Sequence, residues 1–254
     1  MDNNELSENI VRILHLETNP VAVTLYEDKD EMPRNPLPNK HNFCQLVSLA
    51  RTAGRTNASV PEKMICAFGA ACLGLINTPE SIRSGSAAVG AYVANPEAGK
   101  NFMNNVYKLG DSGKQYEGVM VQALSDVSED QQPDAVLIYC NPLQAMRLIH
   151  ANAYETGEKI MADTVAEGAM CSAVGFAAGE NKATIGFPCA GDRIFGGTQS
   201  DELVFAAPYT WVAEKLVNNL EKSAEGGFSV IPVSPNMHWT PAMPPSYTIQ
   251  EQDL

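Results

Sequence analysis

The sequence lacks any long hydrophobic run. The longest, residues 135–140, is far short of the roughly 20 apolar residues that a membrane-spanning helix needs. The first five residues, Met1-Asp2-Asn3-Asn4-Glu5, are acidic, and no apolar stretch follows that would serve as the core of a secretory signal. We therefore expect a cytoplasmic protein that does not enter a membrane and whose cysteine thiols stay reduced.

Positive charge is also scarce. The 254 residues include 17 Lys and Arg against 30 Asp and Glu, which gives a net charge of −13. Sequence-independent binding to a phosphate backbone requires a basic face, so this balance argues against nucleic acid as a partner. With 44% hydrophobic and 19% charged residues, the composition is globular and excludes a disordered acidic tail protein.

Several motifs that indicate a cofactor are missing. The chain has no two Cys-x-x-Cys pairs of the zinc type, no ferredoxin-like cysteine run, and no Gly-x-Gly-x-x-Gly or Walker-type sequence. A nucleotide cofactor is therefore not supported. The histidines, His15, His41, His150 and His238, form no recognisable Cys–His signature. His41 is the local candidate for a base because it precedes Cys44 by three residues, although a surface-loop histidine is the more ordinary interpretation.

Helical and extended patterns alternate along the chain. Helices are predicted at residues 3–15, 43–53, 96–109, 142–154, 168–178 and 212–220, and strands at 21–26, 118–124, 134–139, 183–187 and 202–207. No repeat or internal linker is visible. The pattern predicts a mixed α/β (α+β) single domain over residues 1–228, with a mixed sheet flanked by helices.

Residues 229–254 differ in character. Prolines at positions 232, 235, 241, 244 and 245 forbid regular structure, while Met237, Trp239, Met243 and Tyr247 are apolar enough to dock. A solvated end is the ordinary interpretation. We favour an extended proline-rich C-terminal arm that lies across its own domain or a second subunit, and we expect a homo-oligomer on that basis.

The six cysteines fall into two groups. Four lie at predicted helix starts or in turns, where local dipoles stabilise the thiolate form that binds metal or attacks electrophiles: Cys44, Cys66, Cys171 and Cys189. Cys72 and Cys140 lie in apolar stretches and are expected to be core thiols. The same explanation can apply to all six, because cysteine is among the most buried residue types and often only fills space.

Blocks across most of the chain resemble the family known as domain of unknown function 169. They are Asn19-Pro20-Val21-Ala22-Val23, Phe43-Cys44, Ala50-Arg51, Gly54, Cys66-Ala67-Phe68-Gly69, Leu73-Gly74-Leu75, Asn141-Pro142-Leu143-Gln144-Ala145, Cys171, Ile185-Gly186-Phe187-Pro188-Cys189-Ala190-Gly191-Asp192-Arg193 and Asp201-Glu202. The resemblance extends from Leu16 to Pro208. It implies membership of that fold family and cysteines at positions 44, 66, 171 and 189, with Cys72 and Cys140 outside the pattern. It implies no known reaction.

Two motifs depart from that family. After the second cysteine the family often has Pro-Gly-Gly, where this chain has Ala67-Phe68-Gly69. After the last cysteine it often has Gly-Ser-Arg, where this chain has Gly191-Asp192-Arg193. Neither departure removes a thiol, but both put the shape of the pocket in doubt.

Taken with the resemblance, the four thiols are interpreted as ligands of one centre, a [4Fe–4S] cluster, with zinc as the alternative. A zinc site usually organises short loops with close ligand pairs, whereas single ligands from a stable α/β domain suit a cluster better. Either centre leaves a net charge of −2, which Arg51 and Arg193 are placed to offset. Gly69 and Gly191 are predicted to bind the cofactor, because small residues and free amides let a ligand approach the backbone. Residues 191–197 also fit a plain turn between two strands.

Three functions remain open. The first is redox chemistry or electron transfer at the cluster, with an unidentified small-molecule substrate or redox partner. The second is non-enzymatic binding of zinc or a cluster for storage, delivery or sensing. The third is a metal-free thiol enzyme with Cys66 or Cys189 as nucleophile, which would need a base. The sequence identifies no catalytic residue and no substrate.

Overall fold

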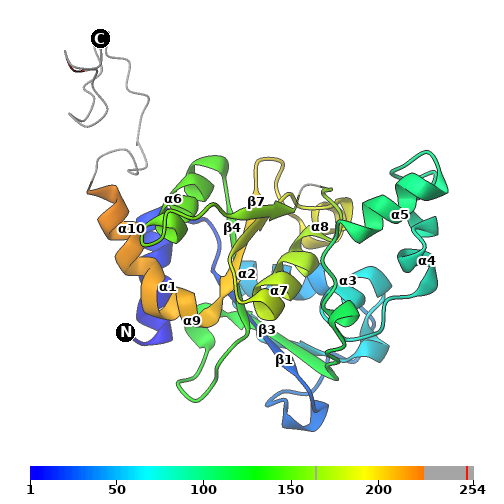
Figure 1. Cartoon of the computed structure of the whole chain (residues 1–254). Helices are drawn as coiled ribbons and strands as arrows, with labels where there is room; N and C mark the ends of the chain where they lie inside the picture. Colours follow the sequence, from blue (N-terminus) through cyan, green and yellow to red (C-terminus); the bar gives the residue numbers. More distant parts are fainter. Residues whose placement is uncertain (164, 226–249, 251–254) are drawn as a thin grey trace.

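The protein is organised around one seven-stranded mixed sheet, seen in a computed structural model that describes residues 1–163, 165–225 and 250 (Figure 1). The strand order is β2-β3-β1-β4-β7-β6-β5. The strands are β1 (Val21–Tyr26), β2 (Asn57–Ser59), β3 (Gly118–Ala123), β4 (Ala135–Cys140), β5 (Met161–Asp163), β6 (Thr184–Gly186) and β7 (Leu203–Pro208). The β5–β6 pair is parallel and the other pairs are antiparallel. The predicted mixed α/β fold is confirmed.

Alternation along the central strands sends side chains into two separate cores. Val21 and Val23 of β1 face one core, and Ala22 between them faces the other. Likewise Leu137 of β4 faces the first core and Ile138 the second. Successive side chains of a strand point to opposite faces. When helices cover both faces of the sheet, the sequence of a central strand is therefore an unbroken apolar run.

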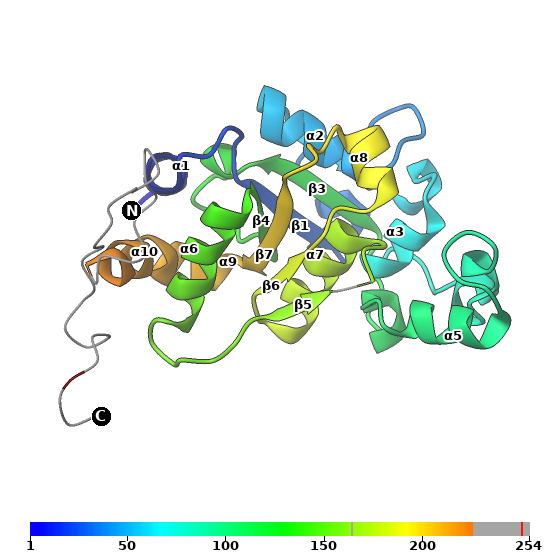
Figure 2. The ribbon, with the colours of Figure 1, turned by 90° about the horizontal axis from the view of Figure 1, so that it is seen from above.

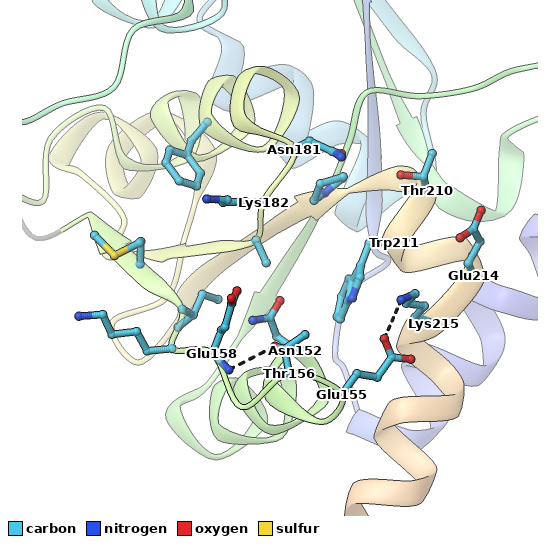
Figure 3. Close-up of a pocket in the computed structure, with 16 residues that line it drawn as sticks. Asn152, Glu155, Thr156, Glu158, Asn181, Lys182, Thr210, Trp211, Glu214 and Lys215 are labelled. Carbon is cyan, nitrogen blue, oxygen red and sulfur yellow. Dashed lines mark hydrogen bonds and ion pairs between the residues drawn. The ribbon is translucent and has the colours of Figure 1, made fainter.

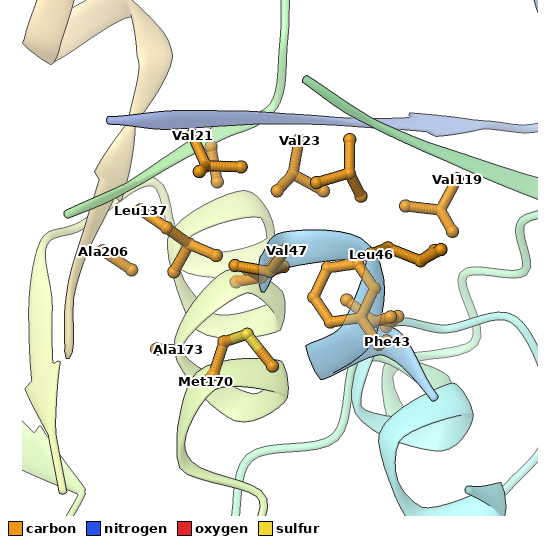
Figure 4. Packing of buried hydrophobic residues seen from close by; sticks show 14 of the residues in the cluster. Val21, Val23, Phe43, Leu46, Val47, Val119, Leu137, Met170, Ala173 and Ala206 are labelled. Carbon is orange, nitrogen blue, oxygen red and sulfur yellow. The ribbon is translucent and has the colours of Figure 1, made fainter. Parts of the chain in front are cut away.

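Four helices cover the first face: α2 (Phe43–Ala53), α3 (Ala67–Cys72), α7 (Ala169–Glu180) and α8 (Ala190–Gly196). Figure 4 shows Phe43, Val47 and Met170 from these helices packed against valines and Leu137 of the sheet. Burial of each such side chain stabilises the fold by about 1.5–3 kcal/mol. This core therefore fixes the helices that carry the four predicted cysteine ligands.

The second face is covered by α1 (Asn3–Leu14), α6 (Pro142–Ala153) and a continuous C-terminal helix. That helix runs from α9 (Tyr209–Trp211) through a π-helical turn, η6 (Val212–Leu216), into α10 (Val217–Ala224). The helices α1 and α6 begin at residues 3 and 142, where the sequence predicts them, and a side-chain cap precedes each. Asp2 accepts a hydrogen bond from the Glu5 amide at 2.8 Å, and Asn141 forms a capping box with Gln144.

A small helical insertion lies beside α3, at the end of the molecule away from α10 (Figure 2). It comprises α4 (Glu80–Arg83) and α5 (Pro96–Asn104), and Ile82, Ala88 and Met103 form its own small core. The remaining single turns are η1 (Lys29–Glu31), η2 (Pro61–Lys63), η3 (Ser86–Ala88), η4 (Leu109–Ser112) and η5 (Leu124–Asp126). Phe68 of α3 packs against the insertion core, which places the insertion next to the cysteine-bearing helices.

Three predictions differ from the structure. The helix that begins at Pro96 ends at Asn104 rather than 109, and the C-terminal helix begins at Tyr209 rather than 212. The simple turn considered for residues 191–197 is wrong, because Ala190–Gly196 forms α8. The predicted arm at 229–254 lies, apart from residue 250, outside the described residues, as does the 228/229 domain boundary. Within the described part of the chain, no helix is both long and apolar enough to cross a membrane.

Candidate functional site

One pocket is lined by four cysteines from four separate segments. Cys44, Cys66, Cys171 and Cys189 all contribute to its wall, and its cavity volume is about 80 Å³. They belong to α2, to the start of α3, to α7 and to the start of α8, which lie together on one face of the sheet (Figure 2). The fold thus brings together the four thiols that the sequence singles out. Their role as ligands stays a prediction.

All four cysteines lie at helix N-termini. Cys44 and Cys171 are in the first turns of α2 and α7, and Cys66 and Cys189 are the N-cap residues of α3 and α8. The Gly69 amide donates to Cys66 Sγ at 3.3 Å. Hydrogen bonds from the backbone amides of Asp192 and Gly168 lower the pKa of Cys189 against a larger rise caused by burial. Amides that point at sulfur favour negative charge on it.

Two glycines leave room for the sulfurs. A Cβ at Gly69 would lie 3.1 Å from Cys171 Sγ and 3.7 Å from Cys66 Sγ, so these two sulfurs are neighbours across Gly69. A Cβ at Gly191 would lie 3.7 Å from Cys189 Sγ, which is an ordinary contact, and the Gly191 carbonyl accepts a hydrogen bond from Cys44 at 3.6 Å. Both glycines predicted to bind the cofactor therefore contact the thiols, and Gly69 has the tighter fit.

Burial and repulsion between sulfurs keep Cys44, Cys171 and Cys189 protonated when no metal is bound. Burial raises the pKa of Cys44 to about 12, and the charges of Asp192, Cys189 and Cys66 add to the effect. Burial also raises the pKa of Cys171 well above its usual value, followed by repulsion from Cys72 and the other three pocket cysteines. Because the ionised sulfurs repel one another, a bound cationic centre would lower these pKa values.

The rest of the lining is apolar and acidic. Its hydrophobic members are Phe43, Phe68, Met170 and Phe195, and its acidic members are Glu167 and Asp192. Among the described residues that line the pocket there is no Lys, Arg or His. The site therefore favours a positively charged occupant.

Behind the pocket a buried polar network connects α2, β4 and α8. The Tyr139 hydroxyl donates to the Asp192 carboxylate, at 3.1 Å to Oδ1 and 3.0 Å to Oδ2. The Arg51 guanidinium lies 3.9 Å from the centre of the Tyr139 ring and forms an ion pair with Glu202 at 2.7 Å. Arg51 also donates to the Gly197 carbonyl, directly after α8. This network fixes α8, and with it Cys189, to α2 and the sheet.

The two predicted arginines do not line the pocket. Arg51 is 3% exposed and its charge is paired with Glu202, while Arg193 donates to the Gln199 carbonyl at 2.6 Å. Their predicted part in offsetting a cofactor charge stays untested. Asp192, Tyr139 and Glu167 were not predicted as site residues, because only the fold brings them near the thiols.

The other residues singled out by sequence have structural positions. His41 is buried rather than in an exposed loop, with Nε2 2.7 Å from Ser59 Oγ and Nδ1 2.8 Å from the Asn39 carbonyl, and burial lowers its pKa. Cys72 and Cys140 are both buried, as predicted. Cys140 belongs to the core on the opposite face of the sheet, whereas Cys72 is close enough to Cys171 to affect its pKa.

The thiols as arranged are not a single-ion site. Across residues 1–163 and 165–225, no three His, Cys, Asp or Glu side chains form a group that could hold one metal ion. Tetrahedral zinc with Zn–S bonds of about 2.3 Å requires sulfurs about 3.8 Å apart. The four cysteines therefore line a shared cavity but are not arranged around one tetrahedral ion.

A second pocket of about 350 Å³ lies between the end of α6, the end of α7 and the start of the C-terminal helix (Figure 3). Trp211, Asn152 and Lys182 line it, and Lys215 forms an ion pair with Glu155 at 2.6 Å. It contains none of the residues that the sequence analysis selected.

The chain is similar to proteins of one family, and that family has no described activity. The family model of DUF169, described as uncharacterised ArCR, matches residues 9–219. The uncharacterized protein MJ0308 of Methanocaldococcus jannaschii is 28% identical over 219 residues, which cover 82% of this chain and 91% of that protein. No solved structure matches the chain significantly.

Proposed function

The chain belongs to the DUF169 family, and we propose that its four-cysteine pocket binds a [4Fe–4S] cluster used in electron transfer or redox chemistry. The observation that carries the proposal is the convergence of Cys44, Cys66, Cys171 and Cys189 on one pocket from four separate segments. Four cysteine thiolates are the usual ligand set of such clusters.

The surroundings of the sulfurs support this proposal. The Gly69 amide donates to Cys66, and amides of Gly168 and Asp192 donate to Cys189. Hydrogen bonds to sulfur and the net charge around a cluster are the means by which proteins adjust its reduction potential. When bound, the cluster would supply one-electron transfer. The protein holds the sulfurs, excludes water with Phe43 and Met170, and provides the surrounding charge.

The origin of the ligands in four separate segments favours a cluster over zinc. Each cysteine of a [4Fe–4S] cluster binds a different iron, so the sulfurs lie farther apart than around one zinc ion. The described side chains form no single-ion group, yet the four sulfurs share one cavity of about 80 Å³.

The charge of the pocket favours a low reduction potential. Glu167 and Asp192 line it, and the described lining residues include no Lys, Arg or His, so adding an electron to a cluster that is already at −2 is unfavourable beside such charges. We therefore propose that the protein takes electrons from a strongly reducing partner or substrate.

A second role in cluster or zinc delivery is favoured by the position of one ligand. Cys66 is exposed, whereas Cys44 is buried and Cys171 and Cys189 are partly buried. An exposed ligand can exchange to an acceptor protein first. The metal-free thiol enzyme is less well supported, because burial raises the pKa of Cys189 and the buried His41 ring is held by Ser59.

Anaerobic purification followed by iron and labile-sulfide analysis tests the cluster. We expect a brown protein with a broad visible absorption band that bleaches on reduction, and near-complete loss of colour when Cys44, Cys66, Cys171 or Cys189 is replaced by Ser. Cys140→Ser is the matched control, because this buried thiol lies on the opposite face of the sheet. Colourless protein with stoichiometric zinc would contradict the cluster, as would a brown protein whose colour survives these four substitutions.

The proposed cluster also bears on the cellular location of the protein. A cluster with an exposed ligand is stable only in a reducing compartment, so we propose a cytoplasmic location. The homo-oligomer and the redox partner stay predictions. Light scattering of the full chain and of a chain that ends at Lys222 tests whether the C-terminal segment holds subunits together, since equal masses per chain would contradict it.

A further inference from the structure

The four-cysteine pocket carries a carboxylate that holding a cluster does not require. Glu167 lies two residues before α7 and lines the pocket, and its Oε2 is buried without a hydrogen-bond partner. The Tyr92 hydroxyl interacts with the same carboxyl group. A buried acceptor that lacks a partner is destabilising, and more so when it is charged. The site therefore has an unused place for a hydrogen-bond donor or a cation.

The second acidic group of the pocket is already partnered. Asp192 accepts hydrogen bonds from Tyr139, and hydrogen bonding from Thr198 also lowers its pKa against the rise caused by burial. Glu167 has no basic residue beside it in the described lining. An anion would be repelled by both carboxylates, so the vacant acceptor selects for positive charge.

Aromatic rings line the same pocket as this carboxylate. Phe68 and Phe195 line the pocket, and Tyr92 stacks on Phe102 with ring centres 5.5 Å apart. The Phe68 ring lies so close to Gly168 that a Cβ there would be 2.7 Å from it. Phe195 is 51% exposed beside Gly191, so its ring is available to a ligand. Faces of such rings attract cations.

These features favour an organic cation over a metal ion. Hard metal ions such as Ca²⁺ need six or more oxygen ligands, whereas one unpartnered carboxylate oxygen is present here. Alkylated ammonium groups combine positive charge with apolar surface, and rings next to a carboxylate match both properties.

We propose that the mouth of the four-cysteine pocket binds a small organic cation of the alkylammonium type, with Glu167 as its counter-ion and Phe68 and Phe195 as its walls. The inference rests on the proposed function, since it names the class of substrate that would meet the cluster. Binding itself depends on Glu167 and the rings.

The test uses the anaerobically purified full chain, with iron content measured for every sample. Tetramethylammonium is titrated by ligand-observed NMR and compared with neutral tert-butanol and with acetate. We expect saturable binding of tetramethylammonium, binding of tert-butanol weaker by about tenfold or more, and no binding of acetate. Glu167→Gln should weaken tetramethylammonium binding by about tenfold, and Phe195→Leu by about 2- to 5-fold.

One control variant and a second test variant make the outcome decisive. Glu214→Gln, in the pocket that contains Trp211, should leave binding unchanged. Phe195→Leu replaces a half-exposed ring, so it tests the site even if Glu167→Gln fails to fold. Absent binding to the wild-type chain, equal binding of tert-butanol, or wild-type affinity in both variants would overturn the proposal. If the anaerobically purified protein contains no iron and still binds tetramethylammonium through Glu167, the cluster proposal is overturned and the cation site stands.

Discussion

The ion pair between Arg51 and Glu202 is expected to hold the cysteine site together. Arg51 is 3% exposed, donates to Glu202 at 2.7 and 3.2 Å, and also donates to the Gly197 carbonyl at 3.4 Å. It thereby connects α2, which carries Cys44, to the segment after α8, whose N-cap is Cys189. Arg51→Met keeps most of the apolar stem and removes the charge.

The expected cost follows from what the substitution leaves behind. Removing one partner of a buried pair costs about 3–5 kcal/mol, because the other charge stays without compensation. Glu202 is 16% exposed and regains part of its hydration, so we expect the lower end, about 3 kcal/mol. For a domain of this size that corresponds to a fall in Tm of about 6–12 °C.

A double-mutant cycle measures the pair directly. Urea unfolding of the wild type, Arg51→Met, Glu202→Gln and the double variant should give a coupling of about 2 kcal/mol, because the second substitution removes the unpaired charge. Iron content should fall in both single variants. Additivity within about 0.5 kcal/mol would refute the argument, as would a Tm for Arg51→Met equal to that of the wild type.

Three further predictions follow. Gly69→Ala should lower iron content sharply, because its Cβ would lie 3.1 Å from Cys171 Sγ, without lowering the free energy of unfolding, because alanine favours helix. Gly191→Ala, whose Cβ would lie 3.7 Å from Cys189 Sγ, should retain iron. Equal iron content in both variants would contradict this. The free energy of unfolding of metal-free protein should change little between about pH 7 and 8 and fall as pH rises toward 12. Folding raises the pKa of Cys44 to about 12 and those of Cys171 and Cys189 in the same direction, so the unfolded chain loses these protons first. Urea midpoints that do not change between about pH 8 and 10.5 would contradict it. Loading metal-free protein with Zn²⁺ in weak buffer should release protons and weaken as pH falls, since the thiols must ionise to bind; a pH-independent affinity would show that they are not ligands.

Local signals in the sequence predict most of the elements. Helix caps and apolar runs act over a few residues, so helix starts and central strands can be predicted without the fold. Examples are the caps at Asp2 and Asn141 and the apolar runs of β1 and β4. The strands β2 and β5 have three residues each and exist because a neighbour pairs with them, which no local pattern reveals. Residues 190–196 were ambiguous for a similar reason, because their glycines suit a turn as well as the short helix α8.

Four thiols are set apart from the expected core cysteines in the sequence alone, because they lie at predicted helix starts or in turns and match the family resemblance. Only the fold brings the thiols of α2, α3, α7 and α8 to one cavity, places Glu167 and Asp192 in its lining, and pairs Arg51 with Glu202. The two kinds of signal act over different distances along the chain. Helix caps and periodicity act over one or two turns, whereas the order of strands in the sheet sets which distant segments meet.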